Sequence, residues 1–575
     1  MLKKINLILD KKLKKTLFYF FIVTTLISIL EILSIGLMIP LISAILDENF
    51  LSNNIRNINF FSQYSNSQII IFLLILIVFI YFFKALSLLF FSWLQFSYVA
   101  KLEATLCKKL YTNYLNKSYN FFTKINSSEL IRNITKEVHI FSNLIIFNGL
   151  NFLLEILIVM FISIFLFIFN PKVTFLLLTL CVLISLCLIK LFKKKISKWS
   201  KERQLHEKMK IQHIQQGIGG IKEIKIFGNE KKFIEYYDKH NQRYAVIDKY
   251  FNVVSQSPRI ILEFFAILFF CTVIIFTYLS GINNSEILIM LAVFAAAAFR
   301  LLPSFNRLNV SVTNIRFGIP SIDILYDEKI HETKILPKQT DKNLNNIKDK
   351  INKFESSIKV KNLSFGYNED YILENINLEI KKNTIIGIIG TSGSGKSTLV
   401  DLLIGLHKPK KGSILIDNKN ITLFDQSWKN LIGYVPQNIY LLDDTLEKNI
   451  AFGVSEPLID NDRVINALKL AELYDFVKNN LSEGIHTNIG EGGIKLSGGQ
   501  RQRIGIARAL YKDPKVIFFD EFTSSLDLKT EEKILNTINY FRKNKTIIII
   551  SHRESSLKVC DHIFEMNNKE LRKVK

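Results

Sequence analysis

Eight residues, Gly390–Ser397, read GTSGSGKS and match the pattern G-x-x-x-x-G-K-[ST]. In a loop of this kind the glycines let backbone N–H groups surround a polyphosphate, the lysine reaches its terminal phosphates, and the hydroxyl ligates Mg²⁺. An apolar run before the loop predicts a strand, and the run after it predicts a helix. The stretch therefore predicts a nucleoside triphosphate site in which Lys396 contacts the β- and γ-phosphates and Ser397 contacts Mg²⁺.

Two adjacent acids end a second apolar run, KVIFFDEFTSSLD at Lys515–Asp527. The predicted buried strand carries Asp520 to the position of a Mg²⁺ ligand and Glu521 to that of a base for the attacking water. Taken alone, an Asp-Glu pair at a strand end is also an ordinary structural feature. A further motif, LSGGQ at Leu496–Gln500, opens a predicted helix, and a Ser-Gly-Gly turn at a helix N-terminus is an anion site.

Leu496–Gln500 is identified as the signature sequence of ABC transporters, and the chain resembles that family over essentially its whole length. The resemblance implies that Tyr367 stacks on adenine and that Gln437 senses Mg²⁺ and the attacking water. It implies that Asp527 is the acid of the loop after the second strand and that His552 contacts the γ-phosphate. ATP and Mg²⁺ are the implied cofactors.

The implied site falls into three sets of residues. The catalytic set is Glu521, His552 and Gln437, and the Mg²⁺ set is Ser397, Gln437 and Asp520. The nucleotide-binding set is Tyr367, Gly390, Ser392, Gly393, Gly395, Lys396, Ser397, Thr398, Ser497, Gly498, Gly499, Gln500 and Asp527. In this family the signature of one chain closes on the P-loop of its partner, so the resemblance implies a homodimer with two equal sites.

The composition divides the chain into two parts. The net charge is +23 and 49% of the residues are hydrophobic. A basic balance suits either nucleic acid or the cytoplasmic side of a membrane protein. The sequence shows no nucleic-acid-binding motif, and long apolar runs up to about residue 305 favour the membrane and argue against a nucleic-acid partner. The later residues are typical of a soluble domain.

A helix needs about 20 apolar residues to cross a bilayer. Six segments of roughly this kind are Leu17–Leu46, Ile69–Tyr98, Phe141–Phe169, Val173–Phe192, Pro258–Leu279 and Ile287–Leu302. The resemblance implies an exporter fold. Its expected parts are a six-helix all-α transmembrane domain at 1–328, a linker at 329–356, and an α/β P-loop nucleotide-binding domain at 357–575. Tyr119–Val138 and Gly217–Glu230 resemble the two cytoplasmic coupling segments of that fold.

Lysine and arginine gather in alternate connections. Lys190–Arg203 reads KLFKKKISKWSKER, whereas Gly281–Glu286 has neither residue type. Because cytoplasmic loops carry the excess of these residues, both termini are predicted to be cytoplasmic. With the resemblance, this implies a multi-pass protein of the bacterial inner membrane. In the first external connection Leu51, Ile55 and Ile58 recur at helical spacing, which leaves open an amphipathic helix on the outer leaflet or a plain loop.

Three cations lie within or beside the apolar segments: Lys84, Arg259 and Arg300. From helix geometry they lie ~20–30 Å below the outer ends of their helices, in the inner half of the bilayer or near its inner edge. Charges in a membrane are expensive and are therefore candidates for function, here for binding a phosphate or pyrophosphate headgroup. The alternatives are snorkelling to the interface, pairing of Arg259 with Glu263, or internal pairing with Glu31 or Glu155.

The segments SPRIILEFFAILFF, AFRLLPSFNRL and YFFKALSLLFF resemble those of bacterial flippases for the lipid-linked oligosaccharides of protein N-glycosylation. That resemblance implies an ATP-driven flippase that moves a polyprenyl-pyrophosphate-linked oligosaccharide from the inner to the outer leaflet. The alternatives within transport are exporters of another lipid, a peptide or a drug. The alternatives of another class are an ATP-gated channel or a regulatory ABC subunit, and a channel would show single-channel conductance.

Overall fold

The computed structural model describes residues 1–37, 40–41, 65–169, 171–279, 284–335, 353–420 and 426–575. The chain forms two compact units. The first comprises Met1–Lys117 and Lys124–Lys338, and the second comprises Ser118–Thr123 and Gln339–Lys575. The predicted amphipathic segment around residues 51–61 lies outside the described residues, as does most of the predicted linker.

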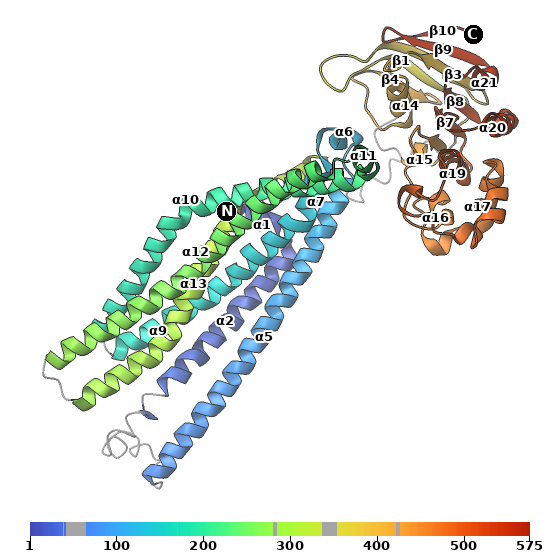
Figure 1. The fold of residues 1–575 in the computed structure, drawn as a ribbon. Coiled ribbons are helices and arrows are strands. Elements are labelled where there is room, and N and C mark those ends of the chain that lie inside the picture. Colours follow the sequence, from blue (N-terminus) through green and yellow to red (C-terminus); the bar gives the residue numbers. More distant parts are fainter. Residues whose placement is uncertain (38–39, 42–64, 170, 280–283, 336–352, 421–425) are drawn as a thin grey trace. The chain divides into compact units, whose positions relative to one another are not determined.

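The first unit is helical (Figure 1). Its long helices are α2 (Lys11–Gly36), α5 (Asn66–Leu115), α9 (Asn148–Phe169), α10 (Pro171–Gly219), α12 (Glu230–Leu279) and α13 (Asn284–Ile335). Its short helices are α1 (Leu2–Ile8), α7 (Ser127–Arg132), α8 (Val138–Ile140) and α11 (Ile221–Phe227), and α6 (Tyr119–Lys124) lies almost wholly in the second unit. Two π-helical stretches, Asn133–Glu137 and Phe141–Phe147, join α7 to α9.

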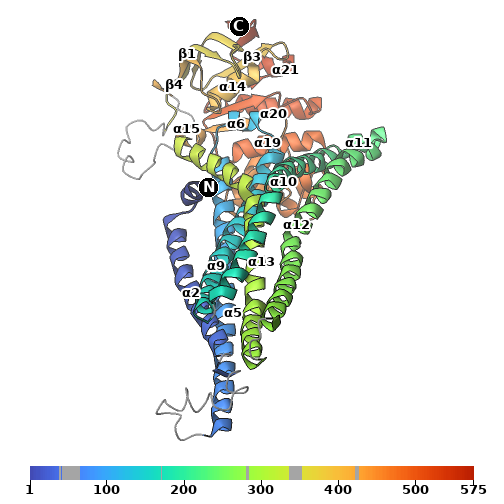
Figure 2. The ribbon, with the colours of Figure 1, turned by 90° about the vertical axis from the view of Figure 1, so that its left-hand side faces the viewer.

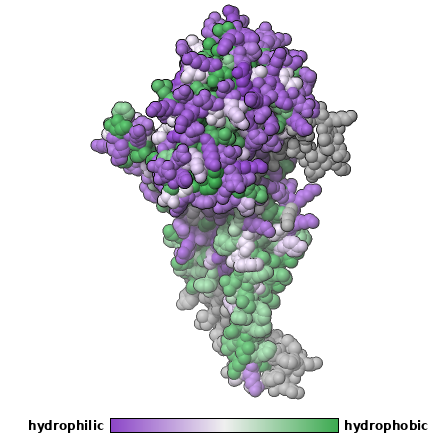
Figure 3. Space-filling view, turned by 90° about the vertical axis from the view of Figure 1, so that its right-hand side faces the viewer, coloured by the Kyte–Doolittle hydropathy of each residue, from purple (hydrophilic) through white to green (hydrophobic). Residues whose placement is uncertain are grey.

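Within the described residues, five helices are long and apolar enough to cross a membrane. They overlap the first five predicted segments, although α2 ends at Gly36 and the remainder of Leu17–Leu46 lies mostly outside the described residues. The sixth segment, Ile287–Leu302, lies in α13. The helix α13 continues through Pro303. α10 and α12 lie side by side and lead to α11 (Figure 2). The surface of the long helices is largely hydrophobic, whereas that of the second unit is mostly hydrophilic (Figure 3).

The second unit holds two sheets. The first is antiparallel with the order β2-β1-β4-β5, from β1 (Ser357–Phe365), β2 (Leu373–Lys381), β4 (Lys411–Ile416) and β5 (Lys419–Asn420). The second has the order β10-β9-β3-β8-β7-β6, from β3 (Ile385–Gly390), β6 (Ile432–Val435), β7 (Val516–Asp520), β8 (Thr546–Ile550), β9 (His562–Asn567) and β10 (Glu570–Lys573). In it, β9, β3, β8, β7 and β6 are parallel, and β10 is antiparallel to β9.

After β3, the part of the second unit that the structure describes also contains eight α-helices. They are α14 (Lys396–Ile404), α15 (Gln426–Lys429), α16 (Leu446–Ile450), α17 (Asn461–Leu470), α18 (Tyr474–Asn480), α19 (Gly498–Tyr511), α20 (Leu528–Phe541) and α21 (Glu554–Lys558). All five residues of β7 and all five of β8 are buried. Continuous apolar runs such as TIIII form these strands because a parallel sheet is covered on both faces.

Candidate nucleotide site and buried cations

The strand register brings the predicted motifs to one edge of the parallel sheet. Ile550 in β8 pairs with Ile388 in β3 and with Asp520 in β7, and Val435 in β6 pairs with Phe519. The loops that leave these strands therefore start at nearly the same level, at their carboxyl ends. In open α/β sheets this is the edge at which ligands bind.

The P-loop connects β3 to α14 as the sequence predicts. Gly393 and Gly395 have φ angles of 80° and 101°, a region that residues with a Cβ rarely occupy. Lys396 is 6% exposed, and its Nζ donates hydrogen bonds to the carbonyls of Gly390 (2.7 Å) and Thr391 (2.8 Å). Burial lowers the pKa of Lys396, against the opposing effect of Glu521 and Asp520. The ammonium group is thus held inside the loop.

The residues of this loop fit ATP and Mg²⁺. Ser394 Oγ is buried and has no hydrogen-bond partner among the described residues, so the cradle holds an unused polar atom. The Asp520 carboxylate accepts a hydrogen bond from the Ser397 hydroxyl, and burial raises the pKa of Asp520. Mg²⁺ in nucleotide sites is typically bound by a hydroxyl and one carboxylate of the protein together with phosphate oxygens and water. The positive charge of the ion would favour the ionised form of Asp520.

The three predicted catalytic side chains lie together. Gln437 Nε2 donates a hydrogen bond to Glu521 Oε2 at 2.7 Å, and His552 Nε2 lies 3.6 Å from Glu521 Oε1. Glu521 has a φ angle of 48°, a left-handed conformation that is uncommon for this residue and concentrates at functional sites. The strained turn directs the carboxylate toward a glutamine and a histidine. This arrangement allows Glu521 to accept a proton from a water that the other two groups position.

The predicted adenine-stacking residue, Tyr367, belongs to a small aromatic cluster. Its ring lies 5.3 Å from the rings of Phe365 and His407, measured between centroids, and Phe365 and His407 are 5.1 Å apart. His407 is 4% exposed, and burial lowers its pKa. His407 could not be singled out from the sequence because a single histidine belongs to no motif. The contact between the His407 and Tyr367 rings orients the tyrosine ring on which adenine would stack.

The signature sequence forms the first turn of α19. Ser497 Oγ accepts a hydrogen bond from the Gln500 backbone N–H at 3.3 Å, and Gln500 Oε1 accepts one from the Ser497 N–H at 2.8 Å. This capping box leaves the N–H groups of Gly498 and Gly499 available for an anion. A Cβ on Gly499 would lie 2.9 Å from the Ser525 carbonyl oxygen, so the turn needs glycine there.

Asp527 starts the helix that follows the loop after β7. Its carboxylate accepts a hydrogen bond from the Thr530 N–H at 3.0 Å and caps α20. Ser392 and Thr398 flank the loop glycines and lysine, and Thr398 is buried in α14. The structure therefore gives Asp527 and Thr398 structural roles in addition to their predicted roles toward ATP.

Two of the three predicted cargo cations meet on one carboxylate in the helical unit. Lys84 Nζ lies 2.9 Å and Arg300 Nε 2.6 Å from Glu31 Oε1, and the Glu31 side chain is fully buried. Arg259 instead pairs with Glu263 at 2.9 Å, one turn along α12, and its side chain is 66% exposed. The sequence left open two alternatives to cargo binding, which were internal pairing with Glu31 and pairing of Arg259 with Glu263. The structure contains both kinds of pairing.

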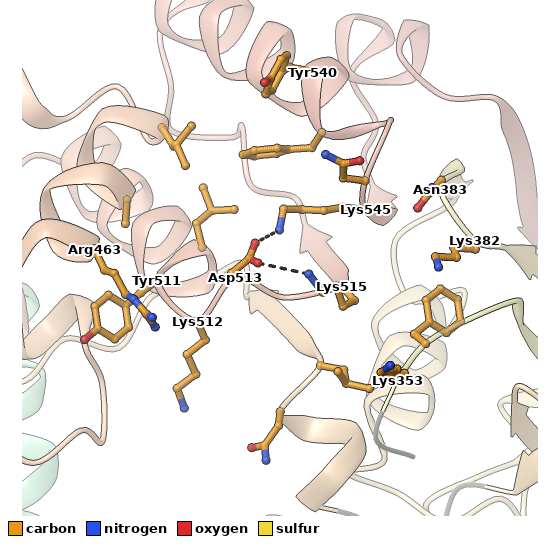
Figure 4. A pocket seen from close by; sticks show the side chains of 18 of the residues that line it. Lys353, Lys382, Asn383, Arg463, Tyr511, Lys512, Asp513, Lys515, Tyr540 and Lys545 are labelled. Atoms are coloured by element: carbon orange, nitrogen blue, oxygen red, sulfur yellow. Dashed lines mark hydrogen bonds and ion pairs between the residues drawn. The ribbon is translucent and has the colours of Figure 1, made fainter. Parts of the chain in front are cut away.

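A cavity of about 1270 Å³ lies at the opposite edge of the parallel sheet (Figure 4). Its lining includes Leu431, Lys515 and Lys545, which immediately precede β6, β7 and β8, and Lys382, in the turn between β2 and β3. Asp513 pairs with Lys515 at 3.3 Å and also with Lys545. Because it opens at the amino-terminal ends of the strands, this cavity is not part of the predicted nucleotide site.

Stability should respond to pH through Asp401, which lies in α14 behind the P-loop. Burial and the nearby Asp520 raise the pKa of Asp401 to about 6. The folded state therefore binds the proton more tightly than the unfolded state, and this group's contribution to stability is lost as pH rises through 6. Asp401→Asn should stabilise the full chain at pH 7.5 by about 1 kcal/mol, discounted for partial exposure, and by less at pH 5. Thermal unfolding at the two pH values measures this.

Asp417 provides a control of opposite sign. Desolvation of its carboxyl is outweighed by hydrogen bonds from the N–H groups of Glu355, Ser356 and Ser357 and from the Ser356 hydroxyl, so its pKa is lowered. Asp417→Asn should therefore destabilise the protein at pH 7.5. A loss of stability in Asp401→Asn at pH 7.5 would contradict the assignment of a buried, strained carboxylate.

Comparisons with known proteins agree with this geometry. A family model described as the ABC transporter matches residues 373–524, and one described as the ABC transporter transmembrane region matches residues 14–302. An ATP-dependent lipid A-core flippase of Francisella tularensis is 31% identical over 478 residues, 80% of this chain and 74% of the relative. A leukotoxin translocation ATP-binding protein of Mannheimia glucosida is 46% identical over 220 residues. That match covers 38% of this chain and only 31% of the relative.

A solved bacterial Atm1-family ABC exporter with ATP bound has the same fold, with a TM-score of 0.79 and 21% sequence identity. The similarity covers 98% of this chain and 95% of that one. The chain belongs to the ABC transporter family, and within it has the exporter fold, in which a helical transmembrane domain is fused to an α/β nucleotide-binding domain.

Proposed function

We propose that this chain is one half of a homodimeric, ATP-driven flippase of the bacterial inner membrane, with both termini in the cytoplasm. Its proposed cargo is a polyprenyl-pyrophosphate-linked oligosaccharide, moved from the inner to the outer leaflet. ATP and Mg²⁺ bind through the P-loop, Asp520 and the partner's signature turn. When bound, the ion would offset the negative charge of the phosphates. Gln437 and His552 position the attacking water, and Glu521 accepts its proton.

The observation that carries the cargo proposal is the meeting of Lys84 and Arg300 in the helical unit. Their side chains are 13% and 20% exposed, and both lie within apolar stretches of their helices, YFFKALSLLFF and AFRLLP. Cations inside membrane segments are expensive and point to an anionic ligand. A phosphate or pyrophosphate accepts several hydrogen bonds and two or more charges from such a pair. The naming of a relative as a lipid A-core flippase supports a lipid as the cargo class.

Reconstitution tests the proposed transport directly. We expect liposomes that contain the chain and a fluorescent lipid-linked oligosaccharide to show ATP-dependent movement of the label. When ATP and Mg²⁺ are supplied on the side of the nucleotide-binding domain, the label should leave the leaflet on that side and appear in the opposite leaflet. The reason is that each hydrolysis cycle would carry cargo to the opposite leaflet. Retention of the label at the rate seen without ATP would exclude this cargo, and loss of an unrelated lipid or drug instead would favour another exporter activity.

The cargo cations should differ in importance. Lys84→Gln and Arg300→Gln should each lower the rate of ATP-dependent flipping about tenfold or more, because each removes a buried charge from the pair. Arg259→Gln should have a smaller effect, since Arg259 is already paired with Glu263 on an exposed face. ATPase activity without cargo is measured beside flipping, to separate a loss of cargo binding from a loss of hydrolysis. Equal flipping in wild type and in both buried-cation variants would contradict the proposed site.

A further inference from the structure

Glu31 binds both candidate cargo cations at once. Its Oε1 contacts Lys84 Nζ and Arg300 Nε, which come from α5 and α13, while Glu31 itself lies in α2. Its Oε2 is buried and has no hydrogen-bond partner among the residues that the structure describes. Tyr81 is the fourth residue of this cluster, since Lys84 Nζ lies 4.6 Å from the centre of its ring. One carboxylate therefore occupies the place where an anionic ligand would meet the two cations.

The charges of this cluster do not cancel. Two cations and one carboxylate leave a single positive charge among side chains that are 0–20% exposed. A stabilising ion pair with Glu31 would need only one cation. The second cation is therefore not neutralised within the cluster, and placing its charge in the membrane segment costs free energy. The cluster is also only partly satisfied, because all contacts to Glu31 converge on one of its two oxygens. These features fit an exchangeable counter-ion better than a permanent structural link between three helices.

We propose that Glu31 is a specificity-determining residue of the cargo site, an internal counter-ion that competes with the anionic headgroup for Lys84 and Arg300. This inference rests on the proposed function and adds the regulation of that site. In the cargo-free protein Glu31 holds the two cations and prevents weakly charged lipids from binding there. A pyrophosphate headgroup, with more oxygens and more charge than one carboxylate, displaces Glu31 from the cations. Return of Glu31 to the cations then favours release.

The competition can be measured with four proteins that place three different net charges on the cluster. The net charge is +1 in wild type, +2 in Glu31→Gln, +1 in the double variant Glu31→Gln with Lys84→Met, and 0 in Lys84→Gln. The probe is undecaprenyl pyrophosphate in phosphatidylcholine liposomes, with undecaprenol as the uncharged lipid and inorganic pyrophosphate as a soluble competitor. The readouts are the probe concentration that gives half-maximal ATPase stimulation, and the maximal rate.

Glu31→Gln should lower the half-maximal concentration of undecaprenyl pyrophosphate about tenfold, because a buried charge a few ångströms away no longer competes. Its maximal rate should also fall, because a more tightly held headgroup leaves more slowly. The double variant should return to near the wild-type concentration, and Lys84→Gln should require more lipid than wild type. Undecaprenol should not distinguish the four proteins. Competition by inorganic pyrophosphate would show that the phosphate groups alone are recognised.

Glu155→Gln is the matched control. Glu155 is also buried in the helical unit and pairs with one arginine, Arg307, at 2.5 Å, but it holds neither cargo cation. The Glu155→Gln substitution should leave the half-maximal concentration of undecaprenyl pyrophosphate unchanged. A Glu31→Gln protein that binds the probe as weakly as wild type or more weakly would overturn the counter-ion role and assign Glu31 to helix packing. If no anionic lipid stimulates the wild type, the proposed function itself fails.

Discussion

Hydrolysis of ATP by the Glu521→Gln protein should fall about 10²–10⁴-fold, while ATP binding is retained. Glutamine keeps the shape and the hydrogen-bonding reach of the side chain but cannot accept the proton of the attacking water. Gln437 Nε2, which donates to Glu521 Oε2 at 2.7 Å, can still donate to the amide oxygen of the new residue. Steady-state phosphate release and equilibrium binding of labelled ATP measure the two properties separately.

Glu379→Gln is a suitable control for this experiment. Glu379 lies in β2 of the same unit, and its pair with Lys359, at 3.3 Å, is half exposed, so the exchange should change hydrolysis little. Hydrolysis above a tenth of the wild-type rate in Glu521→Gln would show that another group accepts the proton. Loss of ATP binding in that variant would instead show that the left-handed turn at Glu521 tolerates only the native side chain.

The nucleotide site could be predicted from the sequence because its parts are local. Each functional group of the parallel sheet lies at the end of a buried apolar strand or in the loop and first helical residue after it. The order of strand, loop and helix therefore places Lys396, Asp520, Glu521 and His552 at one edge. The pairing of Ile550 with Ile388 and with Asp520 sets the relative positions of three strands, and this register cannot be read from local sequence patterns. The capping box of Ser497 and Gln500 is similarly local, since its two residues are three positions apart.

The contacts of the helical unit were harder to predict because they join distant segments. A hydropathy pattern gives the length of a helix but not which helices are neighbours or which way a side chain points. Glu31, Lys84 and Arg300 belong to three different helices, and their meeting appears only in the folded structure. The three cations Lys84, Arg259 and Arg300 were therefore predicted together as one candidate set, whereas the structure separates Arg259 from the other two. The π-helical stretches also have no signature in an unbroken apolar pattern.

The proposed homodimer predicts that each complete ATP site is built from two chains. Lys396 belongs to the P-loop side of such a site, and Ser497, at the start of α19, belongs to the signature side. In a symmetric dimer, one chain with Lys396→Met and one with Ser497→Arg would form one site with both defects and one site with none. The reciprocal pairing, wild type with a chain that carries both changes, would place one defect in each site.

Both heterodimers can be isolated with two different affinity tags, each on an additional Glu521→Gln background, and assayed for tightly held ATP. The first pairing should retain about one ATP per dimer and the second about none, although the two contain the same substitutions in the same number. If the sites were instead complete within each chain, the order would reverse, because the wild-type signature and P-loop would then stay together in the second pairing. Homodimers of Lys396→Met and homodimers of Ser497→Arg should retain no tightly held ATP, because every site then carries a defect. The comparison separates a shared site from an internal one without depending on the identity of the cargo.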